Sequence, residues 1–206
     1  MTENPALPIG AYSVRELPAD VLVLPKGTSH WDPALPVGCA SARRKMQFQQ
    51  LYPEAVIQPV RGNVLTRLDK LDSGEYGALI LAEAGLKRLG LSDRITYRFS
   101  PEELVPAAGQ GILAIQTRAG EYADLLARLN SPDGALCAKT ERQLASLLGG
   151  DCSAPVGCHA QLHGTDMTLY GFSGIGGVPR YGSVQGNRND ADLLVQQLAS
   201  KLTITE

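Results

Sequence analysis

The stretch RGNVLTRLDKLDSGEYGALILAEAGLKRLGL, residues 61–91, decides the fold of this chain. After a turn at residues 61–63, apolar residues at helical spacing predict a short amphipathic helix that ends at Gly74. Residues 76–81 then read as a buried strand, and residues 82–90 as a second helix closed by glycine. The stretch therefore predicts a helix–strand–helix unit.

The segments on either side of this stretch continue the alternation of strands and helices. Ser41 is a good N-cap for a helix over residues 42–48. Strands are expected at residues 19–24, 35–39, 55–60 and 95–99. This alternation predicts an α/β domain with a parallel or mixed sheet, in which ligands bind at the carboxyl ends of the strands.

Arginines gather at two of the three expected strand-to-helix junctions. Arg43 and Arg44 follow one strand, and Arg61 and Arg67 follow the next. Guanidinium forks at helix N-termini suit carboxylates or phosphates. A lone arginine in such a place would be a solvated charge on a helix face, but four at adjacent junctions favour an anion-binding site.

The second half of the chain is expected to form a small α+β domain with an antiparallel sheet. Residues 100–103 (SPEE) have the pattern of a helix start with proline at its first position, and residues 130–134 that of a turn at a domain boundary. The remaining expected elements are a strand at 112–116, helices at 121–129, 135–148 and 190–202, a hairpin over 156–172 and a strand at 181–185.

Composition excludes several functional classes. The net charge of −2 gives no basic footprint for nucleic acid, and no apolar run is long enough to span a membrane. The first residues lack the pattern of a signal peptide, so a cytoplasmic location is expected. The four cysteines form no CxxC pair, and His159 and His163 complete no metal-ligand pattern, so no metal site is expected. Cys152, which follows a glycine pair, is more available than a core cysteine would be.

Three segments resemble hydroxymethylbilane synthase, also called porphobilinogen deaminase. These are VGCASARRK onward (residues 37–91), PAAGQGILAIQTR (106–118) and ERQLASLLGGDCSAPVGCHAQL (141–162). The resemblance implies a periplasmic-binding-protein-like α/β half at residues 17–105. It implies that residues 1–16 and 106–129 belong to the family's first domain, and that residues 130–206 form an α+β C-terminal domain carrying the cofactor cysteine.

The resemblance implies a transferase that joins four porphobilinogen molecules into hydroxymethylbilane, with release of ammonia, in tetrapyrrole and heme biosynthesis. Cys152 matches the cysteine that carries a dipyrromethane cofactor through a thioether. A sulfur nucleophile suits this attachment, because loss of ammonia leaves an electrophilic methylene carbon. By the same resemblance the cofactor-binding positions include Ser41, Arg43, Arg44, Arg61 and Gly62, and the substrate-binding positions include Arg67 and Gln110.

The sequence also departs from the family pattern. The family's Lys-Asp string, whose aspartate is the main catalytic group, has no counterpart here, so no catalytic residue is assigned. The usual Thr-Ser-Ser before the arginine pair is Cys39-Ala40-Ser41. The chain is therefore not expected to turn over substrate unaided.

The resemblance leaves an apolar face of residues 112–129 without its usual cover. A separate N-terminal-domain polypeptide or self-association is expected to supply that cover. Three functions remain open: an enzyme completed by a separate first domain, a non-catalytic homologue or partner subunit that binds pyrroles or other polycarboxylates, and a remnant that merely folds.

Overall fold

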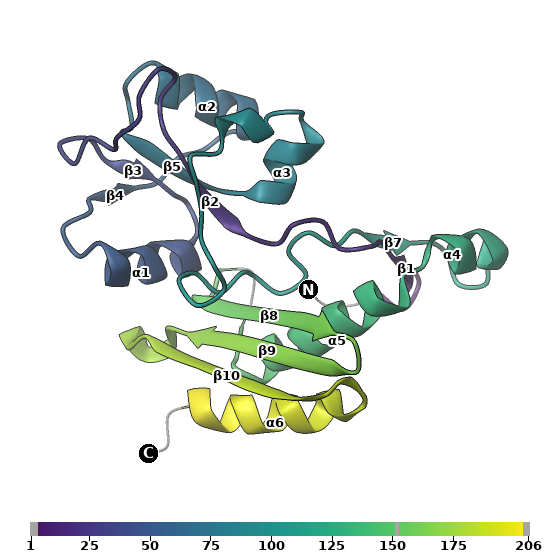
Figure 1. Cartoon of the computed structure of the whole chain (residues 1–206). Coiled ribbons are helices and arrows are strands. Elements are labelled where there is room, and N and C mark those ends of the chain that lie inside the picture. The colour runs from purple at the N-terminus through teal and green to yellow at the C-terminus, as the bar shows by residue number, and fades with distance from the viewer. Residues whose placement is uncertain (1–3, 151–152, 204–206) are drawn as a thin grey trace. The chain divides into compact units, whose positions relative to one another are not determined.

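The computed structural model describes residues 4–150 and 153–203 (Figure 1). It divides into two compact units, one formed by Leu17–Pro106 and the other by Met1–Glu16 together with Ala107–Glu206. We call the first the inserted unit and the second the outer unit. The chain passes between them twice, after Glu16 and after Pro106. The finer division of the outer unit into first-domain residues and a C-terminal domain stays a prediction.

The inserted unit contains a five-stranded mixed sheet in the order β4-β3-β5-β2-β6. Strand β3 is parallel to both β4 and β5, whereas β2 is antiparallel to both β5 and β6. The expected parallel or mixed sheet is thus mixed, and the likeness to periplasmic binding proteins stays a prediction. The strands are β2 (Asp20–Val23), β3 (Val37–Gly38), β4 (Ile57–Gln58), β5 (Ala78–Ala82) and β6 (Tyr97–Arg98).

Helices cover both faces of this sheet (Figure 1). Strand β5 is buried on both sides because Leu79 and Leu81 join one apolar cluster, whereas Ala78 and Ile80 join another. The first cluster includes residues of α2 and α3, and the second includes Phe48 of α1. The helices are α1 (Ala42–Leu51), α2 (Val64–Asp72), α3 (Glu83–Arg88) and the short 3-10 helix η1 (Ser92–Arg94).

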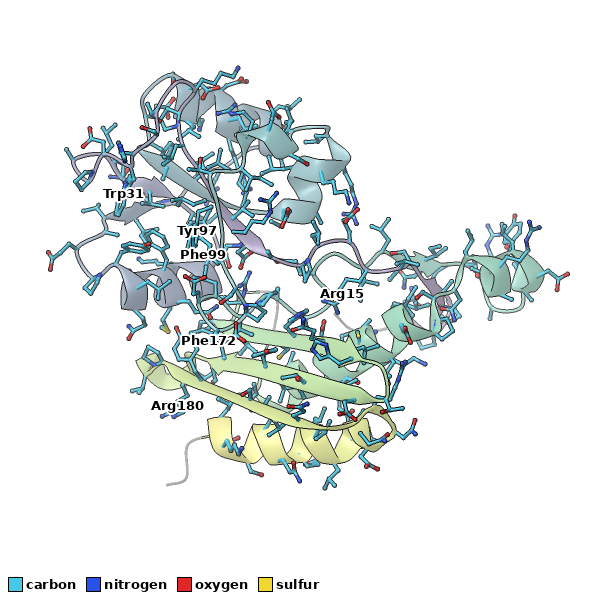
Figure 2. All side chains as sticks on the ribbon, in the orientation of Figure 1. Arg15, Trp31, Tyr97, Phe99, Phe172 and Arg180 are labelled. Atoms are coloured by element: carbon cyan, nitrogen blue, oxygen red, sulfur yellow. The ribbon has the colours of Figure 1, made fainter. Side chains whose placement is uncertain are left out.

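Aromatic rings pack around α1 in the inserted unit; Trp31, Tyr97 and Phe99 are labelled in Figure 2. Phe48 lies 4.7 Å from Tyr52 and 6.0 Å from both Trp31 and Phe99, measured between ring centroids. Tyr97 extends the group, because its ring lies 5.1 Å from that of Phe99. These edge and tilted contacts fix the position of α1 against the sheet.

The outer unit has an antiparallel sheet in the order β10-β9-β8, with α5 and α6 packed against it. Its apolar core joins these two helices to the inward residues of the sheet, including Cys158 and Leu169. A separate antiparallel pair is formed by β1 and β7. The strands are β1 (Ile9–Tyr12), β7 (Ala114–Gln116), β8 (Val156–His163), β9 (Asp166–Ser173) and β10 (Arg180–Asn187). The helices are α4 (Ala123–Leu129), α5 (Pro132–Leu147), α6 (Ala191–Leu202), η2 (Ile175–Gly177) and η3 (Arg188–Asp190).

Two local predictions were wrong. Residues 101–103 form a turn rather than a helix start, and α5 begins at Pro132, inside the segment expected to be a turn. The apolar face over residues 112–129, which was expected to be partly uncovered, is partly exposed. Leu113 and Leu125 are each 52% exposed, but Leu126 is buried and packs so close to Gly10 that a Cβ there would meet it at 2.6 Å.

None of the helices in the described part of the chain is long and apolar enough to cross a membrane.

Candidate functional site

Three strand-to-helix junctions meet at one edge of the sheet in the inserted unit. Strands β4, β3 and β5 are neighbours and run parallel, so their carboxyl ends share that edge. They lead into α2, α1 and α3 respectively. The three junctions therefore share one edge of the sheet, as predicted, whereas α1 and α2 pack on its opposite faces.

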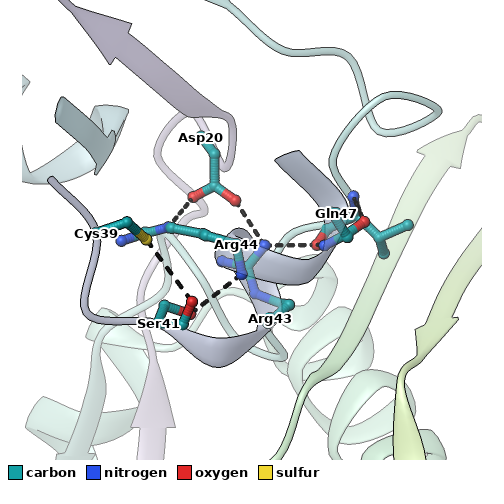
Figure 3. A network of polar contacts seen from close by, with 7 residues as sticks. Asp20, Cys39, Ser41, Arg43, Arg44 and Gln47 are labelled. Carbon is teal, nitrogen blue, oxygen red and sulfur yellow. Dashed lines mark hydrogen bonds and ion pairs between the residues drawn. The ribbon is translucent and has the colours of Figure 1, made fainter. Parts of the chain in front are cut away.

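At the start of α1, Arg43 and Arg44 share one buried carboxylate (Figure 3). Asp20 is fully buried; its Oδ2 accepts a hydrogen bond from Nη1 of Arg43 at 2.6 Å, and its Oδ1 accepts one from Nε of Arg44 at 2.8 Å. Charge-assisted bonds of this length are the strong ones among protein hydrogen bonds. Asp20 was missed from the sequence, where it was only the first polar residue of an apolar strand.

Arg43 lies inside the fold and is not a solvated helix-face charge. It is 3% exposed, and its Nη1 also donates to the carbonyl of Val105 at 2.6 Å. The buried side chain of Gln47 also binds the main chain of Val105. It accepts from the N–H of Val105 at 2.8 Å and donates to the carbonyl of Val105 at 3.1 Å. Arg43 therefore ties Asp20 to the segment that leaves the inserted unit.

Ser41 and Cys39 complete this network. Ser41 caps α1, because its hydroxyl accepts from the N–H of Arg44 at 3.4 Å. The thiol of Cys39 donates to the carbonyl of Ser41 at 3.6 Å. Burial raises the pKa of this thiol, so Cys39 is neutral near pH 7 and is no nucleophile.

The start of α2 is more open. Arg61 and Gly62 are both exposed, and Arg67 folds back so that its Nε donates to the carbonyl of Gly62 at 2.8 Å. Gly62 has φ 113°, and a Cβ there would meet the side chain of Thr66 at 2.8 Å, so the junction requires glycine. Asn63 caps the helix by accepting from the N–H of Thr66 at 2.9 Å.

The start of α3 carries a buried carboxylate instead of an arginine. Glu83 is 2% exposed and accepts from Nε of Arg98 at 2.6 Å. The positive charge of the edge therefore comes from the starts of α1 and α2. Guanidinium groups and capped helix N-termini are donors that suit a ligand bearing several carboxylates, as a dipyrromethane does.

Gln110 belongs to the outer unit, within a turn that spans residues 108–111. The main chain of this turn is held at Gly109 and at Gln110 itself. Glu141 accepts from the N–H of Gly109 at 2.7 Å, and Nη1 of Arg15 donates to the carbonyl of Gln110 at 3.2 Å. Arg15 is labelled in Figure 2.

Glu141 is the centre of a second buried network. It is fully buried, and its Oε1 accepts from Nη2 of Arg15 at 2.5 Å and from the N–H of Ala160 at 2.7 Å. Arg15 also contacts Nδ1 of His159 at 3.2 Å. The network joins the end of the N-terminal segment, the turn with Gln110, α5 and β8 in one piece.

Cys152, the predicted cofactor cysteine, lies outside the described residues. The described cysteines, Cys39, Cys137 and Cys158, are all buried. Burial raises the pKa of Cys137 to about 11, with a smaller contribution from Glu141. None of these three is thus poised as a nucleophile, and within residues 4–150 and 153–203 no cluster of side chains could hold a metal ion.

Comparison with known families matches nearly the whole chain. The model described as "Porphobilinogen deaminase, dipyromethane cofactor binding domain" matches residues 1–124, and that described as "Porphobilinogen deaminase, C-terminal domain" matches residues 135–203. Similar proteins named porphobilinogen deaminase occur in Acetivibrio thermocellus and Ruminiclostridium josui. The first is 45% identical over 95% of this chain and 68% of the relative, and the second 41% identical over 98% of this chain and 69% of the relative.

Proposed function

The chain belongs to the porphobilinogen deaminase family, and we propose that it forms the cofactor- and substrate-binding part of a hydroxymethylbilane synthase. Such an enzyme joins four porphobilinogen molecules head to tail and releases ammonia at each step, in tetrapyrrole and heme biosynthesis. The observation that carries this proposal is the match of two family domains to almost all of the sequence, with more than two fifths of residues identical to the relatives.

The dipyrromethane cofactor would be attached through the sulfur of Cys152. Loss of ammonia from porphobilinogen leaves an electrophilic methylene carbon, and a thiolate can form a C–S bond to it. When bound, the cofactor supplies the pyrrole on which the chain of substrates is built. The burial of Cys39, Cys137 and Cys158 supports Cys152 as the attachment point, because a buried thiol is poorly accessible to an electrophile.

The proposed binding residues lie in both units. Arg43, Arg44 and Arg61, with Ser41 and Gly62, would hold the acetate and propionate groups of the cofactor, and Arg67 and Gln110 would contact the substrate. For the arginines the support is that β3 and β4 are parallel neighbours, so the junctions that lead into α1 and α2 lie at the same edge of the sheet. For Gln110 the support is that the main chain is held at Gly109 and at Gln110 itself.

The chain spans about two thirds of the length of the relatives that it matches. The family's Lys-Asp string has no counterpart in the sequence. We propose that a separate N-terminal-domain polypeptide, or association of the chain with itself, completes the site. The exposure of Leu113 and Leu125, on and beside β7 and α4, supports a covering partner.

Intact-mass spectrometry tests the cofactor proposal. The chain is incubated with porphobilinogen, alone and with a polypeptide that corresponds to the family's first domain, beside a Cys152→Ser control. A dipyrromethane adduct is expected on the wild type and not on the control. No adduct under either condition would overturn the proposal. An adduct without continued release of ammonia would favour the non-catalytic binding homologue instead.

Sedimentation velocity tests the partner proposal. The chain is run over a range of concentrations and again after addition of the first-domain polypeptide. A mass above that of one chain, or a complex with the added polypeptide, is expected. A single monomeric species in both experiments would contradict it.

A further inference from the structure

We propose that Asp20 is a positioning residue of the carboxylate-binding site, and that it holds Arg44 in the orientation in which that arginine meets the ligand. The inference rests on the proposed function, because it presupposes that the start of α1 binds pyrrole carboxylates. Asp20 itself would touch no ligand and would act through the arginines.

The first support is that the two carboxylate oxygens of Asp20 bind different arginines. Oδ2 bonds to the tip of Arg43 through Nη1, whereas Oδ1 bonds to Arg44 through Nε. A bond at Nε fixes the plane of the guanidinium group close to where it joins the side chain. The side chain of Arg44 is 14% exposed and that of Arg43 is 4% exposed, so Arg44 is the member of the pair nearer to solvent.

The second support is the rigidity of the residue that does the holding. Asp20 opens β2 and pairs with Ala82 at the end of β5. Its carbonyl accepts from the N–H of Phe99 at 3.0 Å, and the carbonyl of Ala19 accepts from the N–H of Glu83 at 3.0 Å. A carboxylate mounted on such a strand is held more precisely than one on a loop. It is held at the same edge of the sheet where α1 begins.

The third support is the anchoring of Arg43. Its Nη1 lies between Oδ2 of Asp20 and the carbonyl of Val105, both at 2.6 Å, and Gln47 fixes Val105 through two further hydrogen bonds. Arg43 therefore serves as a brace for Asp20. With one oxygen braced, the other has a fixed position from which to orient Arg44. Preorganisation of this kind favours binding, because a flexible arginine would otherwise lose its rotamer freedom when the ligand arrives.

Positioning and simple charge compensation predict opposite signs for one substitution. If Asp20 only offset positive charge, Asp20→Asn would remove a negative charge near the ligand's carboxylates and would tighten binding. If Asp20 positions Arg44, Asp20→Asn weakens binding despite the more positive site. A loss of about tenfold to a hundredfold is expected, the size of the effect of one hydrogen bond to a charged group on affinity.

Asp72→Asn is the matched control. Asp72, at the far end of α2, also holds two cations: it accepts from Arg94 at 2.7 Å and lies 3.6 Å from Nζ of Lys26. The control removes the same charge from the same unit without touching Arg43 or Arg44. It should leave binding within about twofold of the parent, because exposed charges at a distance are largely screened.

The experiment is isothermal titration calorimetry with porphobilinogen, with all variants in a Cys152→Ser background so that no covalent step intervenes. Each is measured with the first-domain polypeptide present, at two ionic strengths, after circular dichroism has checked its fold. Asp20→Glu is a second variant: it keeps the charge but moves the carboxylate by one methylene, and it too should weaken binding.

The outcomes separate the two proposals. If the Cys152→Ser parent fails to bind porphobilinogen, the proposed function fails and this inference falls with it. If the parent binds and Asp20→Asn binds equally or more tightly, only the positioning role is overturned. A loss in Asp20→Asn matched by an equal loss in Asp72→Asn would also overturn it. If neither Asp20 variant folds, Asp20 serves the stability of the fold and the proposal is rejected.

Discussion

Each unit has a fully buried carboxylate at the centre of a polar network, Asp20 in one and Glu141 in the other, and the two are used differently. Asp20 in the inserted unit gives its two oxygens to the side chains of consecutive arginines on one helix. Glu141 in the outer unit bonds to one arginine and to two main-chain N–H groups, those of Gly109 and Ala160. A carboxylate that binds main chain fixes the path of the polypeptide. One that binds the side chains of two arginines fixes where those side chains can act.

The Asp20 network and the Glu141 network both include residues close in sequence to the two unit boundaries, after Glu16 and after Pro106. Arg15 and Gly109 lie just outside the two passages, and Asp20 and Val105 lie just inside them. In each unit, a buried ion pair therefore fixes the chain segments next to both boundaries. Removal of one partner of such a pair is costly, since an unpaired charge stays buried. The comparison can thus be tested by substitutions in one unit at a time.

Glu141→Gln is expected to have the largest effect on stability. The amide would place an NH₂ group against main-chain N–H donors and leave Arg15 without its counter-charge. The free energy of unfolding should fall by about 3–5 kcal/mol, measured by urea denaturation. Glu121→Gln, which removes an exposed partner of Arg118, is the control and should change it by less than about 1 kcal/mol. If Glu141→Gln lowers the free energy of unfolding no more than Asp20→Asn does, the proposed difference between the two buried carboxylates is contradicted.

Gly111→Ala should come next, since it disturbs the same turn through its backbone. Gly111 has φ 86°, and a Cβ there would lie 2.4 Å from the carbonyl oxygen of Glu16. Gly109 also has a positive φ, of 74°, but a Cβ would meet nothing within 4 Å. Gly109→Ala should therefore lose about 1–2 kcal/mol from the left-handed backbone alone. Gly111→Ala should lower the free energy of unfolding by about 1–3 kcal/mol more than Gly109→Ala does, because of the clash. Equal losses for the two variants in thermal or urea unfolding would contradict the clash.

The smallest expected difference between the units is in the free energy of unfolding contributed by a serine cap of a helix. Ser131 caps α5 with a hydrogen bond of 3.1 Å from the N–H of Gly134, whereas the cap of Ser41 on α1 is longer, at 3.4 Å. Ser131→Ala should lower the free energy of unfolding by about 1 kcal/mol, and Ser41→Ala by less. The measurement is again urea denaturation of each variant. A larger loss for Ser41→Ala would mean that the shorter bond is not the more stabilising cap.

Local patterns predicted most elements, and two Ser-Pro pairs show where such patterns fail. Ser131-Pro132 starts a helix of 16 residues because a long apolar face follows that packs on the sheet. Ser100-Pro101 has the same local signal, but the main chain of Val105 is bound by Gln47 and cannot continue a helix. The rule for proline at the first helical position is sound, yet the outcome depends on contacts far along the chain.

The candidate site was predictable from the sequence in part, as the secondary structure was. The arginines of α1 and α2 could be placed at strand ends because alternation and capping are local signals. The partnership of Asp20 with Arg43 and Arg44 could not, since it depends on the register between β2 and β5 and joins residues more than 20 positions apart. Long-range pairing of this kind leaves no trace in a periodic pattern.

The inserted unit is continuous in sequence, whereas the outer unit is not, and this sets an order of assembly during synthesis. Strand β1 leaves the ribosome early, but its partner β7 follows only after the whole inserted unit; the hydrogen bond from Leu113 to Ser13 spans 100 residues. The inserted unit can therefore complete its sheet first, because domains fold as their residues emerge. The pairing of β1 with β7 is therefore completed only after the inserted unit has been made, so closure of the outer unit is the later step.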